Sequence, residues 1–87
     1  MDSRDFQDLA IDIVVTVYND KKLSSIPIKR EGIFTVWLAK ALNNSKAVLA
    51  TERDDDYLFE VTYNGAMNEC YLDIYEKREN VVIHGDD

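Results

Sequence analysis

The hydrophobic positions of the N-terminal part of the chain follow the spacing of a helix. Between residues 3 and 19, large apolar side chains recur at three- and four-residue steps and form one face of a helix. These residues are Phe6, Leu9, Ile13 and Val17. Residues 11–18 are rich in β-branched side chains, which favour strands, so a strand is the alternative there. The apolar residues continue through Ala10 and Val14, so the stripe is wide enough to pack against a sheet, and we predict a helix over residues 3–19.

A second amphipathic pattern follows a polar loop. The loop runs from Asn19 to Gly32 and contains the only proline of the chain. After it, apolar residues occupy positions i, i+3, i+4, i+7 and i+8 of a helical repeat. They are Phe34, Trp37, Leu38, Ala41 and Leu42. This spacing predicts a second helix that ends at Asn43 and Asn44.

The second half of the chain has the pattern of a β-sheet. Four strand-like segments are separated by short connections rich in turn formers and charged residues, at residues 46–52, 57–63, 70–76 and 81–84. Connections this short imply antiparallel neighbours. We therefore predict a single α+β domain over residues 1–87, with two N-terminal helices packed on one face of a four-stranded antiparallel β-meander.

The alternation within residues 57–63 and 70–76 separates an apolar face from an acidic and aromatic face. The residues that we expect to bind a partner on the second face are Glu60, Tyr71, Asp73 and Tyr75. Tyrosines with carboxylates are typical of interaction surfaces. The alternative is an ordinary solvated sheet face on which the tyrosines cover the pleat, since antiparallel sheets often have one polar face.

The charge of the chain is unevenly distributed and suggests the kind of partner. Residues 1–45 carry as many acidic as basic side chains, so residues 46–87 account for the whole net charge of −7. This charge disfavours direct binding to nucleic acid or to an anionic membrane. Acids on alternate strand positions lie about 6.6 Å apart, close to the spacing of nucleic-acid phosphates. We therefore expect a basic protein surface as partner, and a nucleic-acid-binding protein would offer one.

The densest acidic cluster is Asp54, Asp55 and Asp56, which follows Glu52 and Arg53. Carboxylates are ligands for hard cations, but this run lacks the glycine and glutamate spacing of an EF-hand. A solvated hairpin turn is the simpler interpretation. We predict no metal site here and expect the three aspartates to steer the encounter with a basic partner.

Catalytic and cofactor motifs are missing from the sequence. His84 is the only histidine and Cys70 the only cysteine, so histidine-based catalytic triads and thiolate zinc sites cannot form within one chain. Cys70 starts an apolar alternation and is expected in the core. No phosphate-binding glycine motif occurs. We predict a non-enzymatic protein without a cofactor. One cysteine, an acidic N-terminus and the lack of a long apolar run favour the cytoplasm.

These observations predict a small acidic cytoplasmic protein-binding module. We expect an inhibitor or modulator, of the immunity or phage type, that occludes a basic surface of a partner protein. The first alternative is a structural or assembly subunit that forms homo-oligomers, whose self-association would survive high salt. The second is a helix-turn-helix regulator, which is disfavoured because the stretch between the two expected helices is too long.

Overall fold

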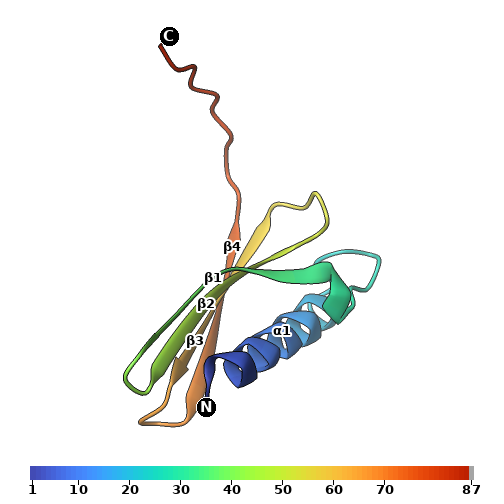
Figure 1. The fold of residues 1–87 in the computed structure, drawn as a ribbon. Coiled ribbons are helices and arrows are strands. Elements are labelled where there is room, and N and C mark those ends of the chain that lie inside the picture. The colour runs from blue at the N-terminus through green and yellow to red at the C-terminus, as the bar shows by residue number, and fades with distance from the viewer. Residues whose placement is uncertain (87) are drawn as a thin grey trace.

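The computed structural model describes residues 1–86 and has two layers, a helix and a sheet (Figure 1). The elements are helix α1 (Ser3–Asp20), the 3-10 turn η1 (Arg30–Gly32) and strands β1 (Ile33–Ala41), β2 (Asn44–Thr51), β3 (Tyr57–Asn64) and β4 (Glu69–Glu76). The strands are antiparallel and lie in the order β1-β2-β3-β4. The α+β class and the antiparallel meander are confirmed. The prediction of two helices is wrong, because residues 1–86 contain one α-helix and one 3-10 turn.

Helix α1 includes the segment for which a strand was the alternative. Asp2 caps its N-terminus, where the carboxylate accepts a hydrogen bond of 2.8 Å from the Asp5 amide. The buried face repeats every four residues, at Phe6, Ala10, Val14 and Tyr18. The β-branched side chains beside this face also pack against the core, so tertiary contacts compensate for their low helix propensity. No helix within residues 1–86 is long and apolar enough to cross a membrane.

The segment predicted as a second helix is strand β1. The register of β1 against β2 shifts between Thr35 and Trp37, so Val36 is an extra residue in a β-bulge. The bulge places Phe34 and Trp37, three positions apart, on the same face of the sheet. A helix produces this same spacing. The dense β-branched and aromatic run at the start of β1 favours the strand.

The predicted strand at residues 81–84 does not form. Residues 77–86 continue from β4 as an extended tail without secondary structure and point away from the sheet (Figure 1). Strand β1 takes the fourth place in the sheet, at the opposite edge from β4. A fourth strand was therefore correctly expected, but the wrong segment was assigned to it.

The core lies between α1 and the face of the sheet beneath it. Fully buried residues of the two central strands contact the buried face of the helix, and they are Ala47, Leu49, Phe59 and Val61. The rings of Tyr18 and Phe59 are 6.1 Å apart between centroids, within the range of favourable aromatic contacts. Beyond the central strands, Leu72 and Ile74 of β4 are only partly buried. The helix contacts β1 and β2 most, so the β4 side of this face is less covered.

The turn between β1 and β2 contains a residue with backbone strain, which a substitution can relieve. Leu42 has a φ of 56° and its side chain is 94% exposed. A left-handed backbone is costly for a residue with a Cβ, by about 1 to 2 kcal/mol. We expect Leu42→Gly to raise the free energy of unfolding by up to about 1 kcal/mol, after the greater entropy of the unfolded glycine chain is included. Urea denaturation tests this, and a loss of stability would contradict it.

Candidate functional site

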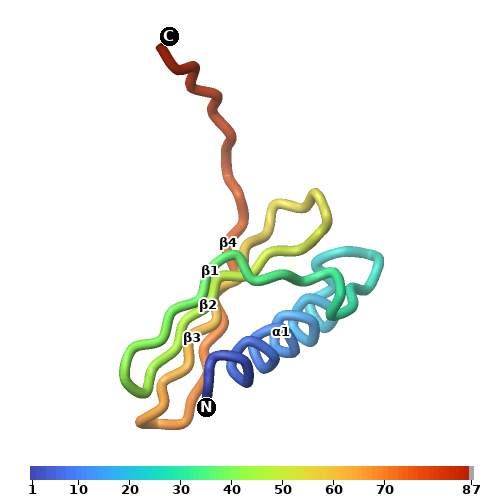
Figure 2. Tube along the Cα trace, viewed as in Figure 1, coloured from blue at the N-terminus to red at the C-terminus, as the bar shows by residue number. Residues whose placement is uncertain are grey.

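Helix α1 covers one face of the sheet and leaves the opposite face, here called the outer face, without a second layer (Figure 2). Side chains alternate along each strand, so the neighbours of the buried residues define the outer face. Cross-strand partners place its residues in three rows. The first row joins the pairs Phe34–Ala50 and Leu58–Tyr75, which follow the last pair of β2 with β3, Leu49 and Phe59. The second row is Trp37, Val48, Glu60 and Asp73, and the third is Ala39, Lys46, Thr62 and Tyr71.

The outer face includes all four sheet residues predicted to bind a partner. Glu60 lies opposite Asp73 across β3 and β4. The Tyr75 hydroxyl donates to Glu60 Oε1 at 3.5 Å, and Lys46 Nζ lies 3.6 Å from the same oxygen. Tyr71 is in the third row and its hydroxyl donates to Glu69. The β3 and β4 half of the outer face therefore carries paired carboxylates beside exposed tyrosines.

An apolar region also crosses the outer face from β1 to β4, which the sequence interpretation missed. Phe34 and Trp37 are each 51% exposed, Tyr75 is 50% exposed and Leu58 is 39% exposed. Val48 and Ala50 lie between them on β2 and are partly buried. We call this group the apolar patch. The assignment of a second helix hid the patch, because it placed Phe34 and Trp37 in the core.

The neighbouring carboxylates raise the pKa of the two exposed tyrosines. The hydrogen bond to Glu69, followed by the charge of Glu69, raises the pKa of Tyr71 above its usual value of 10.0. For Tyr75, the charge of Glu60 is the largest cause of a raised pKa, and Asp73 adds to it. Both phenols are therefore hydrogen-bond donors near neutral pH, and the charge of this region comes from its carboxylates and Lys46.

The acidic run between β2 and β3 is a structural element, which the sequence interpretation also missed. Asp55 accepts hydrogen bonds from the Tyr18 hydroxyl at 2.8 Å and the Thr51 hydroxyl at 3.1 Å. The amide of Tyr57 donates to its other oxygen at 3.3 Å. Asp55 thus joins the end of α1 to the hairpin. Its carboxylate is engaged within the protein, so Asp55 is poorly placed to attract a partner.

Arg53 extends this cluster to the loop after α1. Its guanidinium lies over the Tyr18 ring, 5.6 Å from the centroid, and Nη2 donates to the Pro27 carbonyl at 2.7 Å. The Nη1 atom donates to the Ile26 carbonyl. A cation over a ring and charge-assisted hydrogen bonds both stabilise such a junction. The charged composition of residues 52–56 is typical of a solvated turn. Only the contacts with α1 and the loop after α1 reveal the structural role of this segment.

The Tyr18 contacts predict a specific dependence of stability on pH. Burial is the largest cause of a raised pKa for Tyr18, and the hydrogen bond to Asp55 adds to it. Folded protein thus holds the phenol proton more tightly than the unfolded chain, whose pKa is near 10.0. The resulting stabilisation is complete below about pH 10 and is lost as the pH rises through the folded pKa. We expect Tyr18→Phe to lose stability less steeply above about pH 10 than the wild type, measured by urea denaturation. Identical slopes would contradict this.

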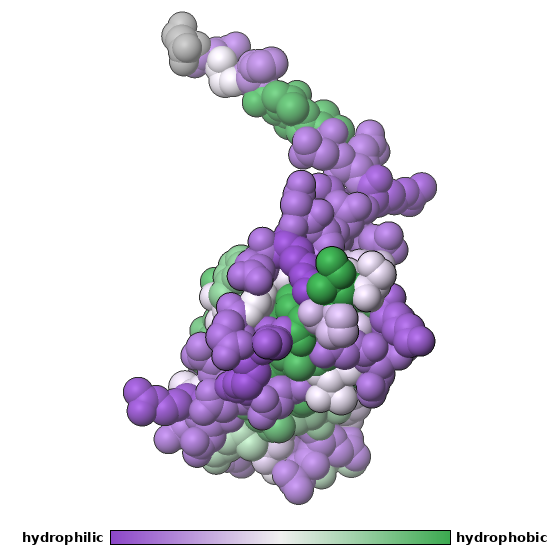
Figure 3. Space-filling view, turned by 90° about the vertical axis from the view of Figure 1, so that its right-hand side faces the viewer, coloured by the Kyte–Doolittle hydropathy of each residue, from purple (hydrophilic) through white to green (hydrophobic). Residues whose placement is uncertain are grey.

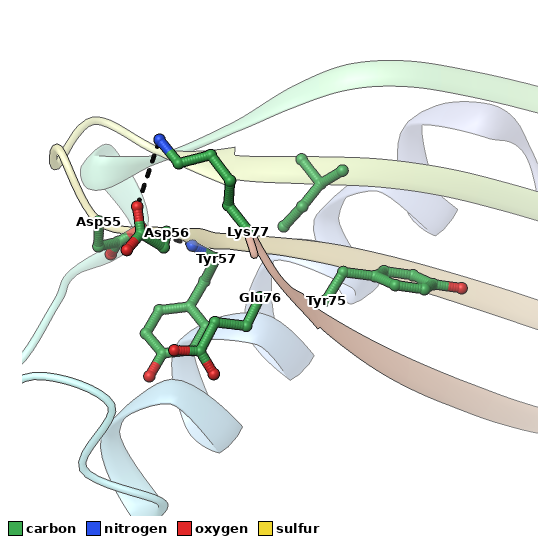
Figure 4. A pocket seen from close by; sticks show the side chains of 7 residues that line it. Asp55, Asp56, Tyr57, Tyr75, Glu76 and Lys77 are labelled. Carbon is green, nitrogen blue, oxygen red and sulfur yellow. Dashed lines mark hydrogen bonds and ion pairs between the residues drawn. The ribbon is translucent and has the colours of Figure 1, made fainter. Parts of the chain in front are cut away.

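Asp54 and Asp56 are exposed at the same turn. Lys77 Nζ pairs with Asp56 at 3.3 Å, and the Lys77 amide donates to the Asp56 carbonyl at 2.7 Å. Asp56 and Lys77 border an open pocket of about 340 Å³ at the ends of β3 and β4, which Leu58, Tyr75 and Glu76 also line. Figure 4 shows Lys77 reaching Asp56 while Tyr57 and Glu76 point toward the side of α1. The pocket adjoins the outer face through Leu58 and Tyr75.

The only cysteine, Cys70, and the only histidine, His84, lie apart from the outer face. Cys70 was expected in the core, but it is exposed on β4, because the helix covers β4 incompletely. Desolvation raises the pKa of its thiol, which favours the less reactive protonated form. His84 is exposed in the tail, and within residues 1–86 no group of three or more His, Cys, Asp or Glu side chains could hold a metal ion.

Comparisons with known proteins give one result. No curated protein and no solved structure matches the chain. A family model described as a family of unknown function, DUF6275, matches residues 7–85 and therefore includes most of α1, the whole sheet and most of the tail. The chain belongs to this family of unknown function, DUF6275.

Proposed function

We propose that this protein is a binding module whose outer face docks on a basic surface of another protein. The observation that carries the proposal is the position of the apolar patch. Its large exposed side chains, Phe34, Trp37, Leu58 and Tyr75, lie together on the one face of the sheet that α1 leaves uncovered. Contiguous exposed apolar side chains with a polar border are typical of interaction sites in small proteins.

The composition of the outer face suits a protein partner. Tryptophan and tyrosine supply much of the binding energy at many interfaces, since they bury a large area with few rotatable bonds. Trp37 and Tyr75 lie on different strands of this face, so a partner that contacts both would cover the apolar patch. The free energy would come chiefly from this apolar contact.

The carboxylates of the outer face indicate that the partner carries positive charge. Glu60 and Asp73 lie side by side, and Lys46 is paired with only one of them. Lysine or arginine side chains of a partner would be attracted to this pair and to Asp54 and Asp56 at the adjacent turn. The net charge of −7 would increase the rate of encounter at low salt. The proposed mechanism is steric occlusion of a basic surface, as an inhibitor or modulator would act.

Two alternatives follow from the sequence: the first is a structural or assembly subunit that self-associates, and the second, ranked last, is a helix-turn-helix regulator. That motif needs two consecutive helices, and residues 1–86 have a single α-helix. We do not propose this function.

The experiment is an affinity isolation from cells of the source organism with matched charge variants. The test variant is Glu60→Lys with Asp73→Lys on the outer face. The control variant is Asp20→Lys with Glu31→Lys, two exposed acids on α1 and η1. Both variants change the net charge equally, and circular dichroism first confirms that both are folded. Each protein is used at low and at high salt.

We expect the wild type and the control variant to retain the same basic protein at low salt, and the test variant to lose it. The wild-type complex should weaken as salt rises, since screening reduces the contribution of the exposed charges. Equal loss in both variants would show that net charge alone matters and would contradict a role for the outer face. Retention by the test variant would contradict it as well.

A further inference from the structure

We propose that the C-terminal tail of one copy of this protein adds as a β-strand to the free edge of β4 in a second copy, and that the exchange is reciprocal. This interaction is separate from the proposed function of the outer face. The tail, residues 77–86, contains three consecutive apolar residues that are exposed: Val81 by 67%, Val82 by 69% and Ile83 by 87%. In Figure 3 they form an apolar band between hydrophilic parts of the tail, away from the body of the protein.

The backbone of β4 offers a site for another strand. β4 lies at the edge of the sheet, and the amide of Lys77 points toward β3, where it donates to Asp56. Backbone groups point alternately to the two sides of a strand. Those of Cys70, Leu72, Ile74 and Glu76 therefore point outward from the sheet and have no strand partner. An edge of this kind is a template for strand addition.

β4 carries acidic residues but lacks most of the other features that protect an edge. It contains neither proline nor lysine, and its pairing with β3 is regular. The opposite edge strand, β1, has the bulge at Val36 and the exposed Lys40. Bulges and lysines discourage edge pairing. Of the two edges, β4 is therefore the one open to an added strand.

The side chains of β4 favour an apolar strand as its neighbour. Leu72 and Ile74 point to the α1 side of the sheet but are only partly buried, since the helix lies mainly over β1 and β2. A strand beside β4 would extend this face and cover them further. Val81, Val82 and Ile83 are β-branched, and such residues pack well on a sheet.

A symmetric arrangement of two copies satisfies these requirements. When Arg78 lies on the two-fold axis, opposite Arg78 of the second copy, Lys77 is opposite Glu79 of the second copy. Val82 is then opposite Ile74 of the second copy, and His84 is opposite Leu72. Even-numbered residues face even-numbered residues, so the outward backbone groups of β4 meet those of the tail. In each of the two Lys77 and Glu79 pairs, opposite charges face each other across neighbouring strands, which is favourable.

The same tail cannot readily fold back on its own β4. Both the amide and the side chain of Lys77 are bonded to Asp56. These contacts keep the backbone at Lys77 in the direction of β4. Only Arg78, Glu79 and Asn80 would remain to reverse the chain before Val81. Three-residue hairpin loops usually contain a glycine with a left-handed backbone, and this segment has none. A second copy therefore provides the more accessible edge.

Strand exchange would also enlarge the outer face. Residues directly opposite each other in an antiparallel pair point to the same side of the sheet. The two helices would thus lie on one side of a continuous sheet, and both outer faces would lie on the other side. In this register Val81 lies opposite Tyr75 of the second copy on the outer side, so the tail would extend each apolar patch at its β4 edge and leave the top of the patch open to a partner.

The direction of the backbone groups gives a sharp test with the full-length protein. Val82→Pro removes an amide that would donate to β4 of the second copy, whereas Val81→Pro removes an amide that points away from it. Both residues are exposed in the monomer, so both variants should keep the fold, which circular dichroism verifies. Sedimentation equilibrium at low and high salt measures the dissociation constant of the dimer.

We expect a wild-type dimer that becomes tighter as salt screens the repulsion between two acidic chains. Val82→Pro should raise the dissociation constant at least about tenfold, because the symmetric dimer loses a hydrogen bond at each of two sites. Val81→Pro should change it less than about threefold. A monomeric wild type would overturn the proposal. The tail would then bind another partner or fold back on its own β4. Equal effects of the two prolines, or dimerisation without any effect of Val82→Pro, would also overturn it.

Discussion

Replacing Phe59 with alanine is expected to lower the free energy of unfolding by about 3 to 5 kcal/mol. Phe59 is fully buried on central strand β3, and its ring lies 6.1 Å from Tyr18 and 6.4 Å from Tyr57. Its removal leaves a cavity at the junction of the helix and the sheet. Small domains have a total stability of roughly 5 to 15 kcal/mol, so this loss is a large fraction of the stability and should shift the unfolding midpoint to a much lower urea concentration. Urea denaturation followed by circular dichroism measures the loss.

The control for this prediction is the neighbouring residue. Leu58 is next to Phe59 in the chain but lies on the outer face and is 39% exposed. Leu58→Ala should cost much less, roughly 1 kcal/mol, because its side chain is already partly in contact with water. Similar losses for both variants would contradict the assignment of the two faces.

Replacing Trp37 with alanine is expected to weaken binding of the partner by at least about 2 kcal/mol, which is roughly a thirtyfold increase in Kd. Trp37 is 51% exposed and lies beside Val48 in the apolar patch, so docking would bury the rest of its ring. The free energy of unfolding should change by much less than the binding energy. Titration calorimetry with the partner isolated by the wild type measures Kd.

Ile26→Ala is the control for the effect of Trp37. Ile26 is an apolar residue, 67% exposed, in the loop that follows α1, and it lies outside the outer face. Its replacement should leave Kd nearly unchanged. If Ile26→Ala weakened binding as much as Trp37→Ala, the loop and not the outer face would be the docking site.

The sequence predicts part of this structure because some patterns depend on local geometry. The two faces of β3 and β4 follow from strict alternation in residues 57–63 and 70–76, and the register of these strands confirms them. The helical spacing of residues 3–19 likewise identifies α1. The expected stripe included Ala10 and Val14, which are fully buried with Phe6 and Tyr18, whereas Leu9, Ile13 and Val17 lie at its side and are only partly buried. Many residues of α1 are apolar, so the orientation is fixed by the sheet.

Features that depend on distant contacts could not be predicted from the pattern. The bulge at Val36 gives strand β1 a spacing of apolar residues that resembles a helix. Asp55 was taken as a steering charge because its partners, Tyr18 and Thr51, are brought to it only by the fold. In the tail, residues 81–84 have strand propensity, but a strand also needs a neighbour, and residues 1–86 provide none there.

The most direct measurement for the proposed binding face is site-specific photo-crosslinking in cells. The photoreactive amino acid p-benzoyl-phenylalanine replaces Tyr75 on the outer face in one variant and Thr16 on the exposed side of α1 in the other. We expect irradiation to give a discrete product with a basic partner protein from position 75 and none from position 16. The same product from position 16, with none from position 75, would contradict docking through the outer face.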